Sequence, residues 1–234
     1  MQEVNQSVNA KRVECINNSR FDYPITEDNH AYNTVKMLQN KGLCYDWCHI
    51  NIKCGYEKYD EGLSLLSLFP IVDAQEIRIS STSDYYNWKK RSALVIKTEC
   101  DELGFIANTH MGWWDDADES FYDQWKRLSS ALPNGRGFLM GDFNSDAEIK
   151  NEGYDMVKKS GWYDTYSLAK TEEKCYTVKG KIDGWKSHRA KRIDYIFANV
   201  PHKVKTSSIC FDKNVISDHF GVLAELDIQE IKHV

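Results

Sequence analysis

The sequence predicts an α/β protein in which strands occur in neighbouring pairs and helices are inserted between them. Short runs of β-forming residues between turn residues indicate the strands, and apolar residues at helical spacing indicate the helices. Ser92–Thr98 and Gly104–Thr109 are strand-like runs with Asp101-Glu102 between them, which is a hairpin pattern. This order favours α/β layers over a repeating βαβ barrel. We expect the 234 residues to form one domain, residues 1–234.

The other elements follow in chain order. Residues 29–41 predict a helix that Asn29 or Asp28 caps and Gly42 ends. Residues 62–69, closed by Pro70, predict a central strand. Residues 118–132 predict a helix with one apolar face, formed by Phe121, Trp125, Leu128 and Leu132. We also expect a short helix at 153–159 and strands at 137–142, 193–198, 206–211 and 220–228.

Composition limits the class of protein. Hydrophobic residues are 41% and charged residues 28% of the chain, as in soluble globular domains. The net charge of −5 argues against a protein that depends on a basic stripe to hold nucleic acid. No membrane-spanning stretch or signal peptide is evident, so we expect a cytoplasmic protein without a membrane partner. The seven cysteines favour free thiols, and a zinc site at Cys44, Cys48 and Cys54 is the less favoured alternative.

Acidic residues stand at three expected strand ends. Gly141-Asp142-Phe143-Asn144 ends one apolar run, Arg192-Ile193-Asp194-Tyr195-Ile196 begins another, and Ser217-Asp218-His219 precedes a third. Hydrolysis of a phosphate ester needs a divalent cation, a carboxylate that orients or deprotonates water, and donors for the developing charge. These segments therefore predict a metal-assisted phosphate-ester site. The candidates are Glu3, His110, Asp142, Asn144, Asp194, Asp218 and His219.

Each candidate also has a purely structural explanation. Asp142 and Asn144 could make a turn, and Asp218 could cap a turn or helix. Asp194 could form a surface ion pair, and His110 could be a hydrogen-bonded core histidine. The ordered set, rather than any one member, favours the functional interpretation.

The set resembles the endonuclease/exonuclease/phosphatase superfamily over nearly the whole chain. Gln2-Glu3, Glu61-Gly62-Leu63 through Pro70, Thr109-His110, Gly141-Asp142-Phe143-Asn144, Arg192-Ile193-Asp194-Tyr195-Ile196 and Ser217-Asp218-His219 stand in the family order. The resemblance implies a DNase I-like fold, a four-layer sandwich of two mostly antiparallel sheets flanked by helices. It also implies a magnesium-dependent phosphoesterase, with manganese as a possible alternative.

The resemblance assigns roles to the candidate residues. Glu3 resembles the principal metal ligand, and Asp218 a second acidic residue at the metal. Asp142 resembles the group that positions the attacking water, and Asn144 resembles a phosphate contact. His219, oriented by Asp194, and His110 resemble the two histidines that face the phosphate, with Glu61 as an acidic partner of His110. The family pattern has a further strand, ending in Asn, upstream of its Gln-Glu pair. We therefore expect residues 1–234 to lack that first strand and to be weakly active or unstable as written.

The substrate is indicated by residues outside the shared set. Trp113 and Trp114 follow His110 closely and are expected to form a substrate wall, because indole rings pack against sugar faces. Arg91 could reach the phosphate as a bidentate donor, or it could belong to a solvated charge run. The segment from His110 to Asp116 is similar to a bacterial branch of the family, the maltose 6′-phosphate phosphatases, which implies a phosphorylated sugar as substrate.

Two alternatives remain open from the sequence. A nuclease of the same fold would use the basic segment from Lys186 to Arg192, which adjoins the expected site. A binding module without catalytic activity is the third possibility, because the expected first strand is missing.

Overall fold

A computed structural model describes residues 4–13, 21, 23–169, 175–182 and 184–228. Its largest sheet has six strands in the order β4-β5-β6-β7-β9-β8. Neighbouring strands run antiparallel except for β6 and β7, which are parallel. The strands are β4 (Ile71–Arg78), β5 (Ser92–Thr98), β6 (Phe105–His110), β7 (Gly137–Asp142), β8 (Tyr163–Asp164) and β9 (Asp194–Ala198), and the 3₁₀ turn η1 (Asp101–Leu103) joins β5 to β6.

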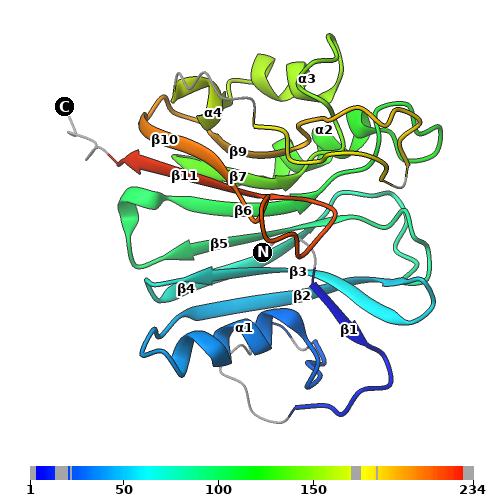
Figure 1. Ribbon diagram of the computed structural model, residues 1–234, viewed down its shortest axis with the longest axis vertical. Helices are drawn as coiled ribbons and strands as arrows, with labels where there is room; N and C mark the ends of the chain where they lie inside the picture. The colour runs from blue at the N-terminus through cyan, green and yellow to red at the C-terminus, as the bar shows by residue number, and fades with distance from the viewer. Residues whose placement is uncertain (1–3, 14–20, 22, 170–174, 183, 229–234) are drawn as a thin grey trace.

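The remaining strands form two smaller sheets. One has the order β1-β3-β2, and the other pairs β10 with β11. Figure 1 shows these strands beside the six-stranded sheet. Their bounds are β1 (Val4–Ser7), β2 (Asp46–Gly55), β3 (Tyr59–Ser67), β10 (Lys203–Cys210) and β11 (Gly221–Asp227). The prediction of a mixed α/β fold with mostly antiparallel sheets is confirmed, although the smaller strands divide into two hydrogen-bonded groups among the described residues.

The helices lie outside the sheets. Figure 1 shows α2, α3 and α4 on one side of the molecule and α1 on the opposite side. The Asn29 side chain caps α1 by accepting a hydrogen bond from the Tyr32 amide, and Ser120 caps α2 in the same way. The helices are α1 (His30–Gln39), α2 (Phe121–Ala131), α3 (Gly153–Lys159) and α4 (Thr165–Leu168). No helix of the described residues is long and apolar enough to cross a membrane.

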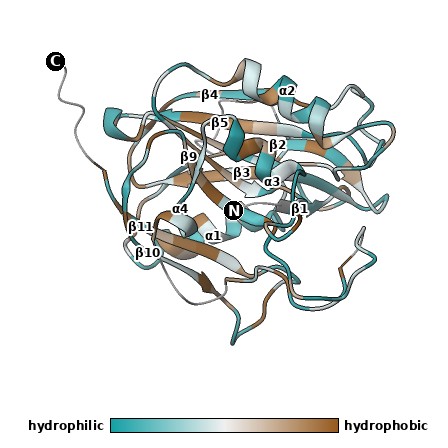
Figure 2. Cartoon of the chain, turned by 90° about the horizontal axis from the view of Figure 1, so that it is seen from above, coloured by the Kyte–Doolittle hydropathy of each residue, from teal (hydrophilic) through white to brown (hydrophobic). Residues whose placement is uncertain are grey.

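The β5 strand separates two hydrophobic clusters. Val95 belongs to the cluster that also holds Trp162 and Trp125, the latter from the predicted apolar helix face. Leu94 and Ile96 point to the other face and join the cluster formed with β2 and β3. Figure 2 shows hydrophobic residues along these strands. A sheet buried on both faces gives the strand ends of β6, β7 and β9 a rigid base.

Candidate functional site

Strand register brings three of the expected site residues together. Parallel pairing of β6 and β7 places His110 opposite Asp142. Antiparallel pairing of β7 and β9 places Asp142 opposite Asp194. The three side chains therefore come from neighbouring positions on adjacent strands, and Asp142 lies on the middle strand.

The backbone around Asp142 explains the glycine and the amide of this segment. Gly141 has φ +131°, and a Cβ there would lie 1.9 Å from the carbonyl oxygen of Thr109. Asn144 has φ +42°, a left-handed conformation that asparagine tolerates better than most residues. Its backbone N–H donates to Asp142 Oδ1 at 2.7 Å. The turn that was the structural alternative thus exists, and it directs both side chains into the same region.

The Asn144 amide connects β6 with the segment after β7. Its Nδ2 donates to the Met111 carbonyl at 2.9 Å and lies 3.1 Å from His110 Nε2. Its Oδ1 accepts from the indole N–H of Trp185 at 3.3 Å. Indole can only donate and a carbonyl can only accept, so these two partners fix which end of the amide faces His110. His110 Nε2 also lies 3.6 Å from Asp142 Oδ2.

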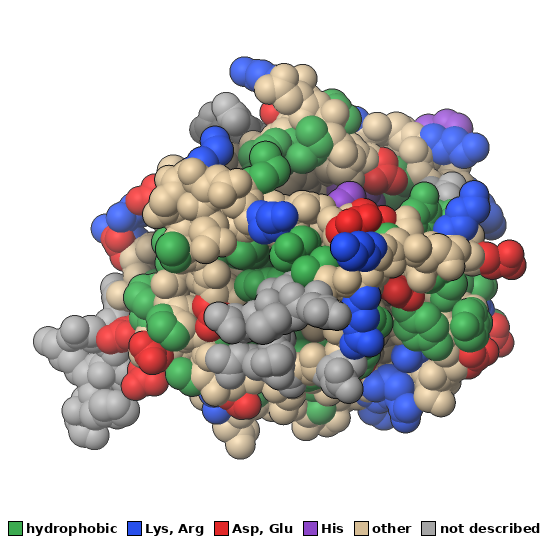
Figure 3. All heavy atoms as spheres, turned by 90° about the horizontal axis from the view of Figure 1, so that it is seen from below, with side chains coloured by type: hydrophobic (Ala, Val, Ile, Leu, Met, Phe, Trp, Pro, Cys, Tyr) green, Lys and Arg blue, Asp and Glu red, His purple; other side chains and the backbone are tan. Residues whose placement is uncertain are grey.

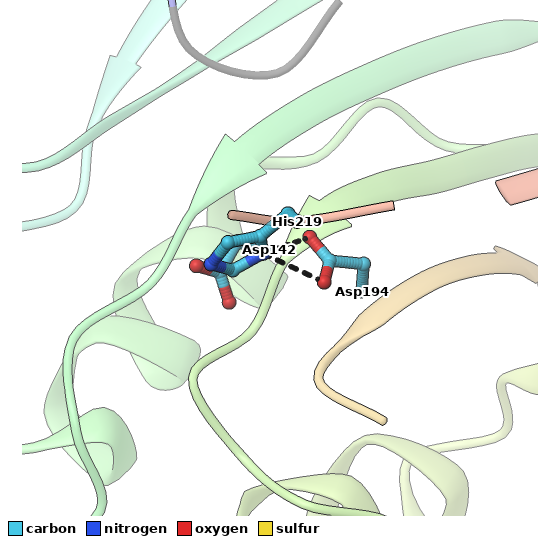
Figure 4. Close-up of side chains that lie close together, drawn as sticks. All are labelled: Asp142, Asp194 and His219. Carbon is cyan, nitrogen blue, oxygen red and sulfur yellow. Dashed lines mark hydrogen bonds and ion pairs between the residues drawn. The ribbon is translucent and has the colours of Figure 1, made fainter. Parts of the chain in front are cut away.

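His219 faces Asp194 across the site (Figure 4). Its Nδ1 lies 2.9 Å from Asp194 Oδ2 and 3.1 Å from Oδ1. Burial disfavours the charged imidazole, but the hydrogen bond and charge of Asp194, with Asp142 and Asp218 adding to it, raise the pKa of His219 to about 9. His219 is therefore an imidazolium at neutral pH.

The acidic residues of the site could bind a cation. One atom each of Asp142, Asp194 and His219 lies within 4.8 Å of the others. A protonated imidazole does not bind a metal, so the two carboxylates are the candidate ligands of this group. Asp194 contacts His219 through both oxygens, and Asp142 Oδ1 accepts from the Asn144 amide. Carboxylate oxygens suit magnesium and other hard divalent cations, so the donor set fits such an ion. Asp218 is exposed, and its charge reaches His219, whereas Glu3 lies outside the described residues.

Arg91 is buried and lies on the same hollow as His110, rather than in a solvated charge run. Its Nη1 donates to the Trp88 carbonyl at 2.9 Å. With Lys53, Lys90 and His110, Arg91 lines a small hollow. Glu61 lines the same hollow and pairs with Lys53 at 3.1 Å. The hollow places cationic side chains next to His110.

The two expected wall residues occupy different environments. Trp113 is half-buried, lies 5.7 Å from the ring of Trp88 and contacts the loop at Gly184. Trp114 packs against the hydrophobic cluster beside Phe121. Trp185, to which the sequence analysis assigns no role, donates its indole N–H to Asn144.

Comparisons with known proteins agree with this arrangement. The model of the Endonuclease/Exonuclease/phosphatase family matches residues 1–219. No curated protein matches the chain. Among solved structures, an endonuclease/exonuclease/phosphatase family protein from Leptotrichia buccalis is 28% identical with a TM-score of 0.84, over 97% of this chain and 86% of that chain.

More distant structures share the fold. A mannosyl-6-phosphatase from Bacteroides thetaiotaomicron is 23% identical with a TM-score of 0.54, covering 84% of this chain and 82% of that one. A 3′ phosphatase from Neisseria bound to a product DNA hairpin is 16% identical with a TM-score of 0.56, covering 82% of both chains. The match of the family model over most of the sequence shows that the chain belongs to the endonuclease/exonuclease/phosphatase family, whose members are hydrolases of phosphoesters.

Proposed function

We propose that this protein is a cytoplasmic, divalent-metal-dependent phosphatase that releases inorganic phosphate from a phosphorylated sugar of the maltose 6′-phosphate type. The observation that carries the proposal is the meeting of Asp142, Asn144, His110 and the Asp194–His219 pair at the ends of β6, β7 and β9. Magnesium is the proposed cofactor, and manganese is the alternative.

Each residue has a role in this proposal. Asp142 orients and deprotonates the attacking water, because it is a buried carboxylate beside the other groups. His219 is protonated and donates through its second ring nitrogen to a phosphoryl oxygen, while Asp194 holds the ring. Asn144 and His110 contact the phosphate. A bound cation would neutralise phosphoryl oxygens, and Asp218 and Glu3 are the residues proposed to hold it.

The basic segment that would favour a nuclease is largely engaged within the fold. Arg189 forms ion pairs with Asp146 at 2.6 Å and Glu148 at 2.8 Å. Arg192 pairs with Asp164 at 2.7 Å among three tyrosine rings, and Lys191 is fully buried. Because these three cations are paired with carboxylates or buried, they are poorly available to contact the phosphates of a DNA backbone. On the face drawn in Figure 3, lysine and arginine side chains are interspersed with acidic and hydrophobic ones.

The surroundings of His110 support a small phosphorylated ligand. Arg91 and Lys90 line a hollow of limited size next to it, and Trp88 and Trp113 stand on the adjoining loops. Cationic side chains beside aromatic rings suit a phosphate carried on a sugar ring. The mannosyl-6-phosphatase with the same fold acts on a substrate of this class, which is consistent with the proposal.

A substrate panel tests the proposal. The purified protein is assayed with magnesium or manganese for phosphate release from maltose 6′-phosphate, glucose 6-phosphate and mannose 6-phosphate, for nicking of plasmid DNA, and for release of a 3′-terminal phosphate from an oligonucleotide. We expect sugar-phosphate turnover that Asp142→Asn lowers by about 100-fold or more. Asp101→Asn is the matched control, because Asp101 is an exposed carboxylate at the opposite end of β6 from His110.

Three outcomes separate the alternatives. Sugar-phosphate turnover that depends on Asp142 supports the proposal. DNA cleavage or 3′-phosphate release that Asp142→Asn abolishes, without sugar-phosphate turnover, would replace it with a nucleic-acid activity. Stabilisation by metal without any turnover would instead indicate a binding module.

A further inference from the structure

Thr177 lies where the chain segments that carry the site residues meet. It is fully buried, and no helix or extended strand contains it. Its Oγ1 accepts hydrogen bonds from the backbone amides of Ile193 at 3.1 Å and Asp194 at 3.3 Å. Its carbonyl oxygen accepts from the amide of Phe220 at 2.7 Å. One residue thus contacts the start of β9 and the residue after His219.

The same junction reaches the segment that follows Asp142. The Ile193 carbonyl accepts a hydrogen bond from the Phe143 amide at 2.8 Å. Ile193 is therefore held on one side by the Thr177 hydroxyl and on the other by the residue between Asp142 and Asn144. The Thr177 amide donates to the Lys191 carbonyl at 3.0 Å, which fixes Thr177 itself against the chain before β9.

We propose that the Thr177 hydroxyl is the positioning group that sets Asp194 against His219. The loop that carries His219 approaches the six-stranded sheet from β10 and β11, which belong to another sheet. The 2.9 Å contact between His219 and Asp194 requires the two sheets to keep a fixed position relative to one another. Thr177 links them, because its hydroxyl accepts from the amides at the start of β9 and its carbonyl accepts from the Phe220 amide.

The hydroxyl, rather than the shape of the side chain, has this effect. A threonine oxygen has two lone pairs and can accept from both amides at once. Valine has the same shape but would leave the buried amides of Ile193 and Asp194 without their acceptor. Serine keeps the oxygen and loses only a methyl group. The pair Thr177→Val and Thr177→Ser therefore separates hydrogen bonding from packing.

The effect of Thr177 on catalysis rests on the proposed function, but the first test of its positioning role needs no substrate. Amide hydrogen exchange is measured on the full protein without metal or ligand. In Thr177→Val we expect exchange at Ile193, Asp194 and Phe220 to become about tenfold faster or more, with Thr177→Ser close to the parent protein. Thr165→Val is the matched control, because Thr165 is also buried and its hydroxyl donates to β9 at Ile196, farther along the strand.

The second readout is the kinetics on whichever substrate the panel identifies. Displacement of a catalytic group acts mainly on the chemical step, so Thr177→Val is expected to lower kcat by about 10- to 100-fold with little change in KM. Thr177→Ser should restore most of kcat. If Thr177→Val does not fold, Thr177→Cys, which keeps a weaker acceptor, should give an intermediate kcat and intermediate exchange.

The proposal is overturned if Thr177→Val exchanges at Phe220 like the parent protein, or if Thr165→Val lowers kcat equally. It is also overturned if Thr177→Ser behaves like Thr177→Val. Absence of turnover in the parent protein would contradict the proposed function alone, because the exchange comparison still tests the junction.

Discussion

The Asp194–His219 pair shows how one carboxylate sets the charge of a histidine. The pKa of His219 rises to about 9 although burial opposes the charged form, because Asp194 contacts Nδ1 and Asp142 and Asp218 add negative charge. The folded-state pKa exceeds the ordinary value of 6.5, so the pair stabilises the fold fully below that pH. This contribution decreases as the pH rises towards 9.

Replacing this carboxylate should move the pH dependence of catalysis. In the parent protein we expect activity to fall as the pH rises through about 9, since His219 then loses its proton. Asp194→Asn should shift this fall to lower pH and reduce kcat at neutral pH by about 100-fold. The measurement is a pH–rate profile, together with an NMR titration of the His219 ring in metal-free protein. An unchanged ring pKa in Asp194→Asn would contradict the assignment of Asp194 as the orienting group.

At the scale of elements, the close approach of β6 and β7 depends on Gly141. A side chain at this position would collide with the Thr109 carbonyl, and its φ of +131° is unfavourable for other residues. Gly141→Ala should lower the free energy of unfolding by about 3 kcal/mol, the upper end of the cost of backbone strain, because a clash is added. Gly135→Ala is the control, because Gly135 has φ +102° and open space around it. It should cost only about 1 kcal/mol.

Urea unfolding of both variants measures this difference. If the two glycine variants lose equal stability, the contact with Thr109 is not what requires glycine, and only the backbone conformation matters. If Gly141→Ala loses more stability than Gly135→Ala, the close spacing of β6 and β7 depends on the absence of a side chain at position 141. The position of His110 opposite Asp142 then depends on it too.

The elements also show what the sequence could predict and what it could not. The site strands β6, β7 and β9 were predicted because apolar runs end at residues with recognisable chemistry. No element was predicted for the β2 segment, although its residues alternate between polar and apolar, and the burial of His49, Asn51 and Lys53 could not have been predicted from that pattern. Alternation of this kind normally indicates a face open to solvent. Here distant polar partners cover that face, and no local pattern reveals them.

Long-range contacts limit the prediction of the site in the same way. Asp142, Asn144, His110, Asp194 and His219 were identified from the order of their motifs, and the structure brings them together. Thr177 gave no signal, because a hydroxyl that accepts from amides 16 and 17 residues away leaves no local pattern. The role of Glu3 and the expected absence of a first strand remain predictions.

At the scale of the whole molecule, a buried polar network joins α1 to the three-stranded sheet β1-β3-β2. His49 is fully buried on β2, with Nδ1 2.9 Å from Ser64 Oγ on β3 and Nε2 2.7 Å from Asn51 Oδ1. Asn29, which caps α1, lies 3.5 Å from the same Nε2. The amide oxygen of Asn51 can only accept, so Nε2 carries the proton and Nδ1 accepts from Ser64. The neutral ring thus bonds to residues on both strands.

This network makes His49 a determinant of acid stability. Burial outweighs the hydrogen bond to Asn51 and lowers the pKa of His49 to about 4. The unfolded chain, with an ordinary value of 6.5, binds the proton more readily, so stability falls as the pH drops from 6.5 towards 4. The loss should reach about 3 kcal/mol from this one residue.

His49→Gln, which keeps hydrogen-bonding groups but does not titrate, should be less stable at pH 7 and should lose less stability between pH 6.5 and 4. Urea unfolding at several pH values measures both slopes, with His188→Gln as the control for an exposed histidine. Equal slopes for His49→Gln and the parent protein would show that other groups govern acid unfolding.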